Sequence, residues 1–169
     1  MDMDNLWMAV SNQGNTNPSW PRCVVNTTNA PAAIGPYYSQ AYMITYRDYA
    51  LHIAGQIGMS PTTGELVPGG ITAEAHQAMM NIQAILNDTP NATFFRNGIP
   101  RFAKCGLPRF DFTYVTECTV SMADLTESAA FNQVYAGFFD DDPPAPAAVQ
   151  VAALPLGARV EIKCNARAR

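Results

Sequence analysis

The stretch of sequence that decides the fold reads PPAPAAVQVAALPLGARVEI and runs from Pro143 to Ile162. Its residues, which follow an Asp-Pro break, are typical of two β-strands at roughly 147–154 and 159–166. The second strand carries a glutamate, Glu161, between Val160 and Ile162. Polar residues that alternate along a terminal strand normally face solvent. Taken alone, the pattern therefore predicts a pair of strands and no site.

The rest of the chain alternates between strand and helix patterns. Period-two runs predict strands at 42–46 and 49–54, with a tight turn at Arg47-Asp48 between them, and another strand at 112–122. Apolar residues at helical spacing predict a helix over 72–86, with Thr72 as its N-cap, and a second helix from about Thr126. The order β-β-α-β-α-β-β predicts an α+β fold with both helices on one face of the sheet.

The chain divides into an N-terminal arm, residues 1–25, and one domain, residues 26–169. The arm is rich in Asn, Ser, Pro and Met and shows no sustained period. A second aperiodic segment, at about 87–111, contains three prolines and two glycines and is expected to be a long loop. A loop of that length inside a compact domain is usually functional or mobile.

Composition narrows the possible partners. Hydrophobic residues make up 48% of the 169 residues and charged residues only 14%, which mildly favours a surface covered by further copies of the chain. The net charge of −4 disfavours nucleic acid and anionic membrane as partners. No apolar run could span a bilayer and no secretion signal opens the chain, so we expect a cytoplasmic protein.

The cysteines and histidines show no metal-binding pattern. The four cysteines have no CxxC or other ligand spacing, and we expect reduced, mostly buried thiols. His52 and His76 have no companions that would complete a zinc site, and we expect them to be packing or surface residues. We therefore expect neither a metal nor a cofactor.

Three separated blocks of the sequence resemble the RidA/YjgF family of reactive-intermediate deaminases: residues 29–41, residues 53–58 with their continuation into the helix, and the C-terminal stretch quoted above. The similarity covers roughly residues 26–166 apart from 87–111, where this chain looks as if it carries an insertion. The resemblance implies a chorismate-mutase-like single domain, with a mixed sheet and two helices on one face. It also implies a homotrimer with a small-molecule cleft between each pair of neighbouring subunits.

The resemblance also implies candidate site residues. Family deaminases hydrolyse an enamine or imine derived from an amino acid to a 2-keto acid and ammonia. In them a glutamate positions the attacking water, a tyrosine shapes the cleft, and an arginine grips the substrate carboxylate. Carried over to this chain, the catalytic candidates are Glu161 and Tyr38, and the substrate-binding candidates are Tyr37, Ala54, Gly55, Asn132, Pro146 and Ala148. Which of the two tyrosines takes the family role stays open.

The chain departs from the family pattern at Pro146, which stands where the deaminases have the arginine. Removing one partner of a desolvated charged pair costs on the order of 2–5 kcal/mol, and proline offers no N–H in exchange. Arg159 and Lys163 fall on the same strand face as Glu161 and could supply another cation, or they could simply face solvent. Tyrosines crowd the 37–49 region, either as cross-strand packing pairs or as the wall of a larger apolar pocket.

Three functions stay open at this point. The chain could be a diverged enzyme doing acid–base or hydrolytic chemistry on an imine, enamine or enol-like intermediate without an anchoring carboxylate, in a specialised biosynthetic pathway. It could instead be a 2-iminobutanoate/2-iminopropanoate deaminase with a relocated cation. The third possibility is a non-catalytic trimer that binds a small molecule. RNA cleavage, claimed for parts of the family, fits this acidic chain least.

Overall fold

The computed structural model describes residues 22–32, 39–46, 48–96, 99–104, 107–140 and 143–168. The described strands form one sheet in the order β6-β5-β1-β2-β3-β9-β7-β8, with β4 also paired to β9. β7 and β8 are parallel and the other paired neighbours are antiparallel, so the sheet is mixed. The strands are β1 (Arg22–Val25), β2 (Ala41–Tyr46), β3 (Asp48–Ile53), β4 (Gln56–Ile57), β5 (Thr93–Arg96), β6 (Ile99–Lys104), β7 (Val115–Met122), β8 (Ala147–Gln150) and β9 (Val160–Ala168).

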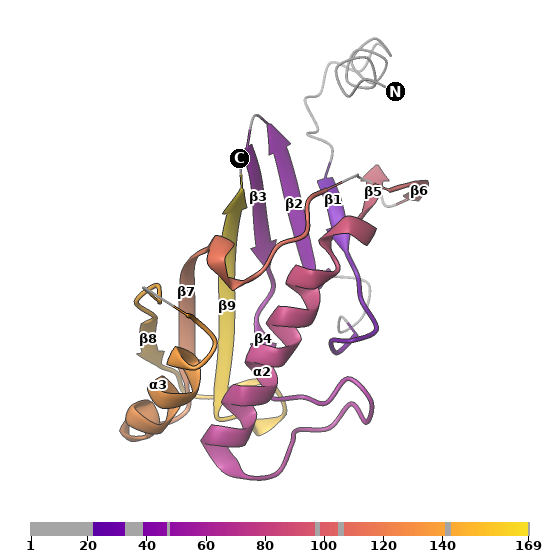
Figure 1. Ribbon diagram of the computed structural model, residues 1–169. Helices are drawn as coiled ribbons and strands as arrows, with labels where there is room; N and C mark the ends of the chain where they lie inside the picture. Colours follow the sequence, from indigo (N-terminus) through magenta and orange to yellow (C-terminus); the bar gives the residue numbers. More distant parts are fainter. Residues whose placement is uncertain are drawn as a thin grey trace.

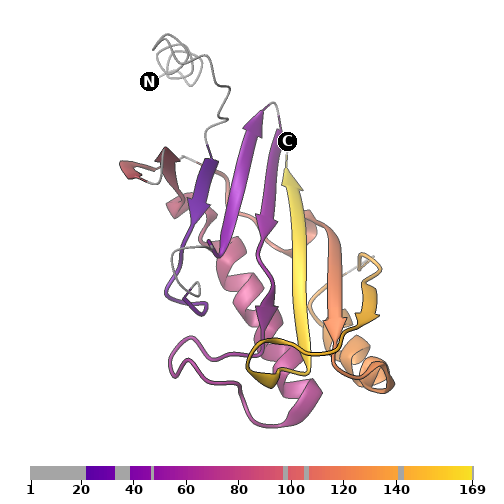
Figure 2. The ribbon, with the colours of Figure 1, turned by 180° about the vertical axis from the view of Figure 1, so that it is seen from behind.

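Two α-helices, α2 (Gly70–Asn87) and α3 (Ser128–Ala136), cover one face of this sheet (Figure 1). Figure 2 shows the opposite face, where the strands lie in front of both helices. Strand β9 shows how the sequence separates the faces: Val160, Ile162 and Cys164 are buried under the helices, while Glu161 and Lys163 point the other way. The predicted α+β class, mixed sheet and placement of the helices are confirmed.

Helix α2 begins two residues earlier than predicted. Its N-cap is Gly69, with φ 119°, and not Thr72, which lies within the first turn. The chain enters the helix through a left-handed conformation that glycine adopts without steric cost. The apolar stripe predicted for this helix is buried as expected, including Ala75, Met79 and Ile82.

Helix α3 and strand β7 depart from their predicted ranges for local reasons. The 3₁₀ turn at Leu125–Glu127 precedes α3 and is capped by Asp124, whose carboxylate accepts hydrogen bonds from the backbone N–H and the hydroxyl of Thr126. These bonds hold the pKa of Asp124 below its usual value. Strand β7 starts at Val115, and a register shift beside Val115 breaks the strict alternation that the sequence suggested.

The segment expected to be a loop is largely regular structure. Strands β5 and β6 form a hairpin that pairs with β1 and extends the sheet at that edge. Strand β1 itself consists of Arg22–Val25, the last residues of the predicted N-terminal arm, and it pairs with the sheet of the domain. Prolines and glycines are typical of loops, but the edge of β1 provides a pairing partner that only the tertiary structure supplies.

The expectation of reduced thiols is also wrong. Cys118 and Cys164 face each other on β7 and β9, both fully buried, and form a disulfide with Cα atoms 4.2 Å apart. Cys23 is disulfide-bonded as well. The spacing of 46 residues between Cys118 and Cys164 carries no signal in the sequence, because only the pairing of the strands brings the two residues together.

Candidate active site

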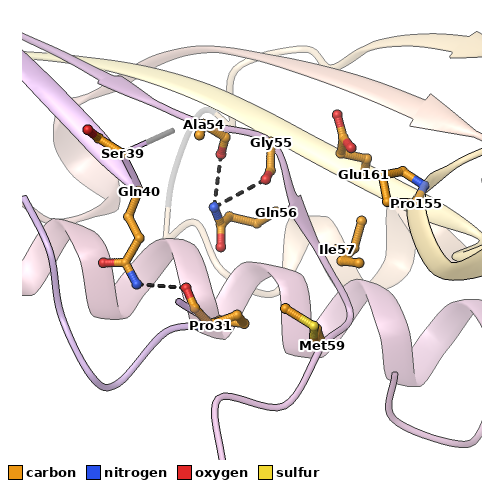
Figure 3. A pocket seen from close by; sticks show the side chains of 10 residues that line it. All are labelled: Pro31, Ser39, Gln40, Ala54, Gly55, Gln56, Ile57, Met59, Pro155 and Glu161. Atoms are coloured by element: carbon orange, nitrogen blue, oxygen red, sulfur yellow. Dashed lines mark hydrogen bonds between the residues drawn. The ribbon is translucent and has the colours of Figure 1, made fainter. Parts of the chain in front are cut away.

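A cavity of about 220 Å³ lies beside Glu161, at the end of the sheet where β4 pairs with β9 (Figure 3). Glu161 reaches it because β9 alternates, which turns this side chain away from the helices. The cavity walls come from four segments: the ends of the β1–β2 connection, the β3–β4 region, the turn before β9, and β9 itself. The lining residues are Pro31, Ser39, Gln40, Ala54, Gly55, Gln56, Ile57, Met59, Pro155 and Glu161.

Gly55 leaves the space that the Glu161 side chain occupies. A Cβ atom at position 55 would lie 2.4 Å from Oε1 and 2.6 Å from Cδ of Glu161, far closer than real contacts allow. The glutamate therefore passes directly over the Gly55 backbone, which fixes where its carboxylate sits. That carboxylate has no hydrogen-bond or ion-pair partner among the residues that the structure describes. A half-buried carboxylate without a partner is available to a bound water or ligand.

Two glutamines hold the cavity wall in place. Buried Gln40 donates from Nε2 to the carbonyl oxygens of Thr27, Ala30 and Pro31, at 2.9, 3.2 and 2.7 Å. Its Oε1 accepts the Thr27 N–H at 2.6 Å. Gln56 Nε2 donates to the carbonyl oxygens of Ala54 and Gly55, at 3.1 and 3.2 Å (Figure 3). Neither glutamine is among the candidate residues that the sequence predicts, although both lie within the blocks that carry the family resemblance.

Three further candidate residues line a second cavity, of about 340 Å³, between α3 and the segment that leads into β8. Asn132, Pro146 and Ala148 all contribute to it, and Tyr135 closes one side by donating its hydroxyl to the Pro144 carbonyl at 2.9 Å. The two cavities share no lining residue. Within one chain the structure thus groups Ala54, Gly55 and Glu161 apart from these three. The candidates Tyr37 and Tyr38 lie outside the described residues.

Neither proposed replacement for the missing arginine lines either cavity. The Arg159 guanidinium forms an ion pair with Glu127 at 2.5 Å, and its backbone N–H donates to the buried Glu74 carboxylate at 2.8 Å. Lys163 is exposed and lies two residues further along β9 than Glu161. Within the described residues, therefore, no relocated cation faces the cavity of Glu161.

The histidines behave as packing residues in the described part of the chain. His52 stacks on Tyr42, and its Nδ1 lies 3.1 Å from Oδ1 of Asn165, while His76 packs against Phe138. The described residues contain no cluster of His, Cys, Asp or Glu that could hold a metal ion. No helix in the same part of the chain is both long and apolar enough to cross a membrane.

Comparison with known proteins matches residues 27–168 to the family described as Endoribonuclease L-PSP. The 2-iminobutanoate/2-iminopropanoate deaminase of Capra hircus is 45% identical over 145 residues, 86% of this chain and 89% of that relative. The crystal structure of RidA from the Antarctic bacterium Psychrobacter sp. is 34% identical with a TM-score of 0.67, covering 85% of this chain and 97% of that one. The crystal structure of the E. coli YjgF gene product is 32% identical with a TM-score of 0.65, covering 86% of this chain and 98% of that one.

These likenesses agree with what the geometry shows: an α+β domain with a mixed sheet, and a cavity beside Glu161. The chain belongs to the RidA/YjgF family. The resemblance drawn from the three sequence blocks is confirmed.

Proposed function

We propose that this protein hydrolyses the C=N bond of imines, and of enamines that tautomerise to imines, at the cavity of Glu161. The observation that carries the proposal is the Glu161 carboxylate, which has no partner among the described residues and is held over Gly55 in a cavity with mostly apolar walls. A carboxylate in such surroundings can accept a proton from water and return it to a leaving amine. The names of the relatives, which are imine deaminases, support the same reaction class.

In the proposed reaction, Glu161 takes one proton from a water molecule while the water oxygen bonds to the iminium carbon. The C=N electron pair moves onto nitrogen and a carbinolamine forms. The protonated glutamic acid then returns its proton to the nitrogen, the C–N bond breaks and ammonia leaves. Loss of the hydroxyl proton to solvent completes a carbonyl product. General acid–base catalysis of this kind contributes roughly 10²–10⁴-fold to the rate.

We also propose that the complete cleft forms between subunits of a homotrimer, with the second cavity of one chain facing the Glu161 cavity of its neighbour. The support is that the candidate residues occupy two separate cavities in one chain, and that the surface carries few charges. Light scattering should then give three times the chain mass of 18.3 kDa. A monomer at assay concentration would contradict this arrangement.

A narrower candidate is a 2-iminobutanoate/2-iminopropanoate deaminase, and the 45% identity to the goat relative of that name favours it. A place in a specialised biosynthetic pathway, or a purely ligand-binding role, stays a prediction. RNA cleavage, named in the family description, gains no support from a cavity whose described lining has a carboxylate as its one charged group. A cytoplasmic location also stays a prediction, and the disulfide at Cys118 weighs against it because disulfides persist mainly in oxidising compartments.

The test is a coupled assay on imines generated enzymatically in situ, with and without a carboxylate, in which the carbonyl product is measured. We expect acceleration by the wild-type protein and a loss of roughly 10²–10⁴-fold in Glu161→Gln. Glu65→Gln, at an exposed loop position outside both cavities, is the matched control and should retain full activity. Unchanged turnover in a correctly assembled Glu161→Gln protein would refute the proposal.

A further inference from the structure

We infer that the Glu161 cavity selects substrates without a carboxylate: neutral imines and, preferentially, their protonated iminium forms. This inference rests on the proposed function for turnover, but it concerns binding and can be tested separately. Three features of the described residues carry it: the charge of the cavity lining, the state of its hydrogen-bond donors, and the position of the nearby cations.

The first feature is charge. Among the described residues that line the cavity, Glu161 is the one ionisable side chain. An anionic substrate would bring a second negative charge close to this carboxylate, with the apolar side chains of Ile57, Met59 and Pro155 around it to limit screening. A cationic iminium would instead provide the opposite charge that the half-buried carboxylate lacks.

The second feature is the lack of free side-chain donors. A bound carboxylate needs N–H or O–H groups that point at its oxygens. Both amides of the lining are already engaged: Gln40 Nε2 serves three backbone carbonyls and Gln56 Nε2 serves two. Each amide nitrogen has only two protons, so neither has one left for a ligand. Of the side chains in the described lining, Ser39 alone keeps a donor without a hydrogen-bond partner.

The third feature is that nearby cations are held elsewhere. Arg159 is paired with Glu127, and Lys163 lies exposed outside the lining. If the second cavity of a neighbouring subunit completes the site, its described lining adds prolines, alanines, Ser128, Asn132 and Tyr135 but no cation. Tyr135 donates its hydroxyl proton to the Pro144 carbonyl oxygen. The described linings of the two cavities, taken together, would therefore still carry a net negative charge.

A matched pair of stable cyclic imines tests the inference by binding alone. In 2-methyl-1-pyrroline and 1-pyrroline-2-carboxylate the imine carbon carries a methyl group or a carboxylate, and the ring is otherwise the same. Titration calorimetry on the full-length protein should give a dissociation constant at least roughly tenfold lower for the methyl compound. Glu161→Gln should reduce that preference, and Met59→Lys, which adds a cation to the lining, should shift it toward the carboxylate.

Equal affinity, tighter binding of the carboxylate, or no binding of either imine would overturn the inference. So would a preference that both variants leave unchanged, because charge would then not set it. The failures of the two proposals are distinguishable. Glu161-dependent turnover of a 2-imino acid with equal or tighter carboxylate binding would retain the proposed function and refute the substrate class. Preferential binding of 2-methyl-1-pyrroline without turnover of any imine would retain the substrate class and refute the proposed function.

Discussion

Replacing Gly55 by alanine should displace the Glu161 carboxylate while leaving the fold intact. The added Cβ would lie 2.4 Å from Oε1 and 2.9 Å from Cγ of Glu161, so the end of this flexible side chain must move. Reaching an ordinary contact requires a shift of about 1 Å, and a misplacement of that size costs roughly 10²-fold in rate. That factor corresponds to about 2.7 kcal/mol of lost transition-state stabilisation.

The free energy of unfolding, by contrast, should not fall together with the activity. Gly55 does not belong to the glycines with positive φ, so alanine is compatible with its backbone. Alanine lowers the conformational entropy of the unfolded chain, which should stabilise the fold by about 0.4–1 kcal/mol. This gain should offset the cost of the local crowding. Steady-state kinetics on an active imine and thermal unfolding of the same sample measure both effects.

Gly64→Ala is the matched control for this experiment. Its Cβ would meet nothing within 4 Å, but its φ of 72° disfavours alanine, so we expect about 1 kcal/mol of lost stability and unchanged kinetics. A wild-type kcat/KM in Gly55→Ala would refute the predicted displacement of the carboxylate. An equal loss of activity in the two variants would also refute it, since a general loss of folded protein would then explain both.

Three further predictions concern stability. Reducing the Cys118–Cys164 disulfide, which closes a loop across 46 residues, should lower the free energy of unfolding by up to about 4 kcal/mol, and an unchanged denaturation midpoint in reductant would contradict this. Burial raises the pKa of Tyr135 to about 12 from its ordinary value of 10.0, so the stability that its neutral phenol contributes should be complete below pH 10 and decline toward pH 12. Comparing Tyr135→Phe with wild type over that range should show the decline in wild type alone. Glu74→Ala leaves the Arg159 N–H without its acceptor and should cost about 1–3 kcal/mol in urea unfolding, whereas Glu74→Gln, which keeps an oxygen there, should cost less.

The sequence predicted those parts of the fold that local patterns determine. The hairpin of β2 and β3, the buried stripe of α2 and the terminal strand β9 all follow from periodicity within a single element. The β5–β6 hairpin did not, because its place in the sheet depends on the edge of β1, some seventy residues earlier in the chain. The disulfide was missed for the same reason, since strand register alone brings its two cysteines together.

The candidate site shows the same division. Family resemblance selected Ala54, Gly55 and Glu161, and the structure places all three around one cavity. It could not show that Asn132 and Pro146 line a different cavity, because this depends on how α3 packs beside β8. The structural role of Gln40 depends on three carbonyl oxygens of a connecting segment, and such contacts leave no periodic trace in a sequence.

The hairpin of β5 and β6 lies at one margin of the sheet, and β5, β1, β2 and β3 separate β6 from β9 in the strand order. Within one chain it is therefore remote from β9, the strand that carries Glu161 (Figure 1). Insertions and deletions in this hairpin could therefore accumulate in evolution while the cavity of Glu161 stays unchanged. Protein engineers could use the same freedom, for instance by grafting an affinity tag or a fluorescent reporter onto the β5–β6 hairpin to follow the protein without disturbing its chemistry.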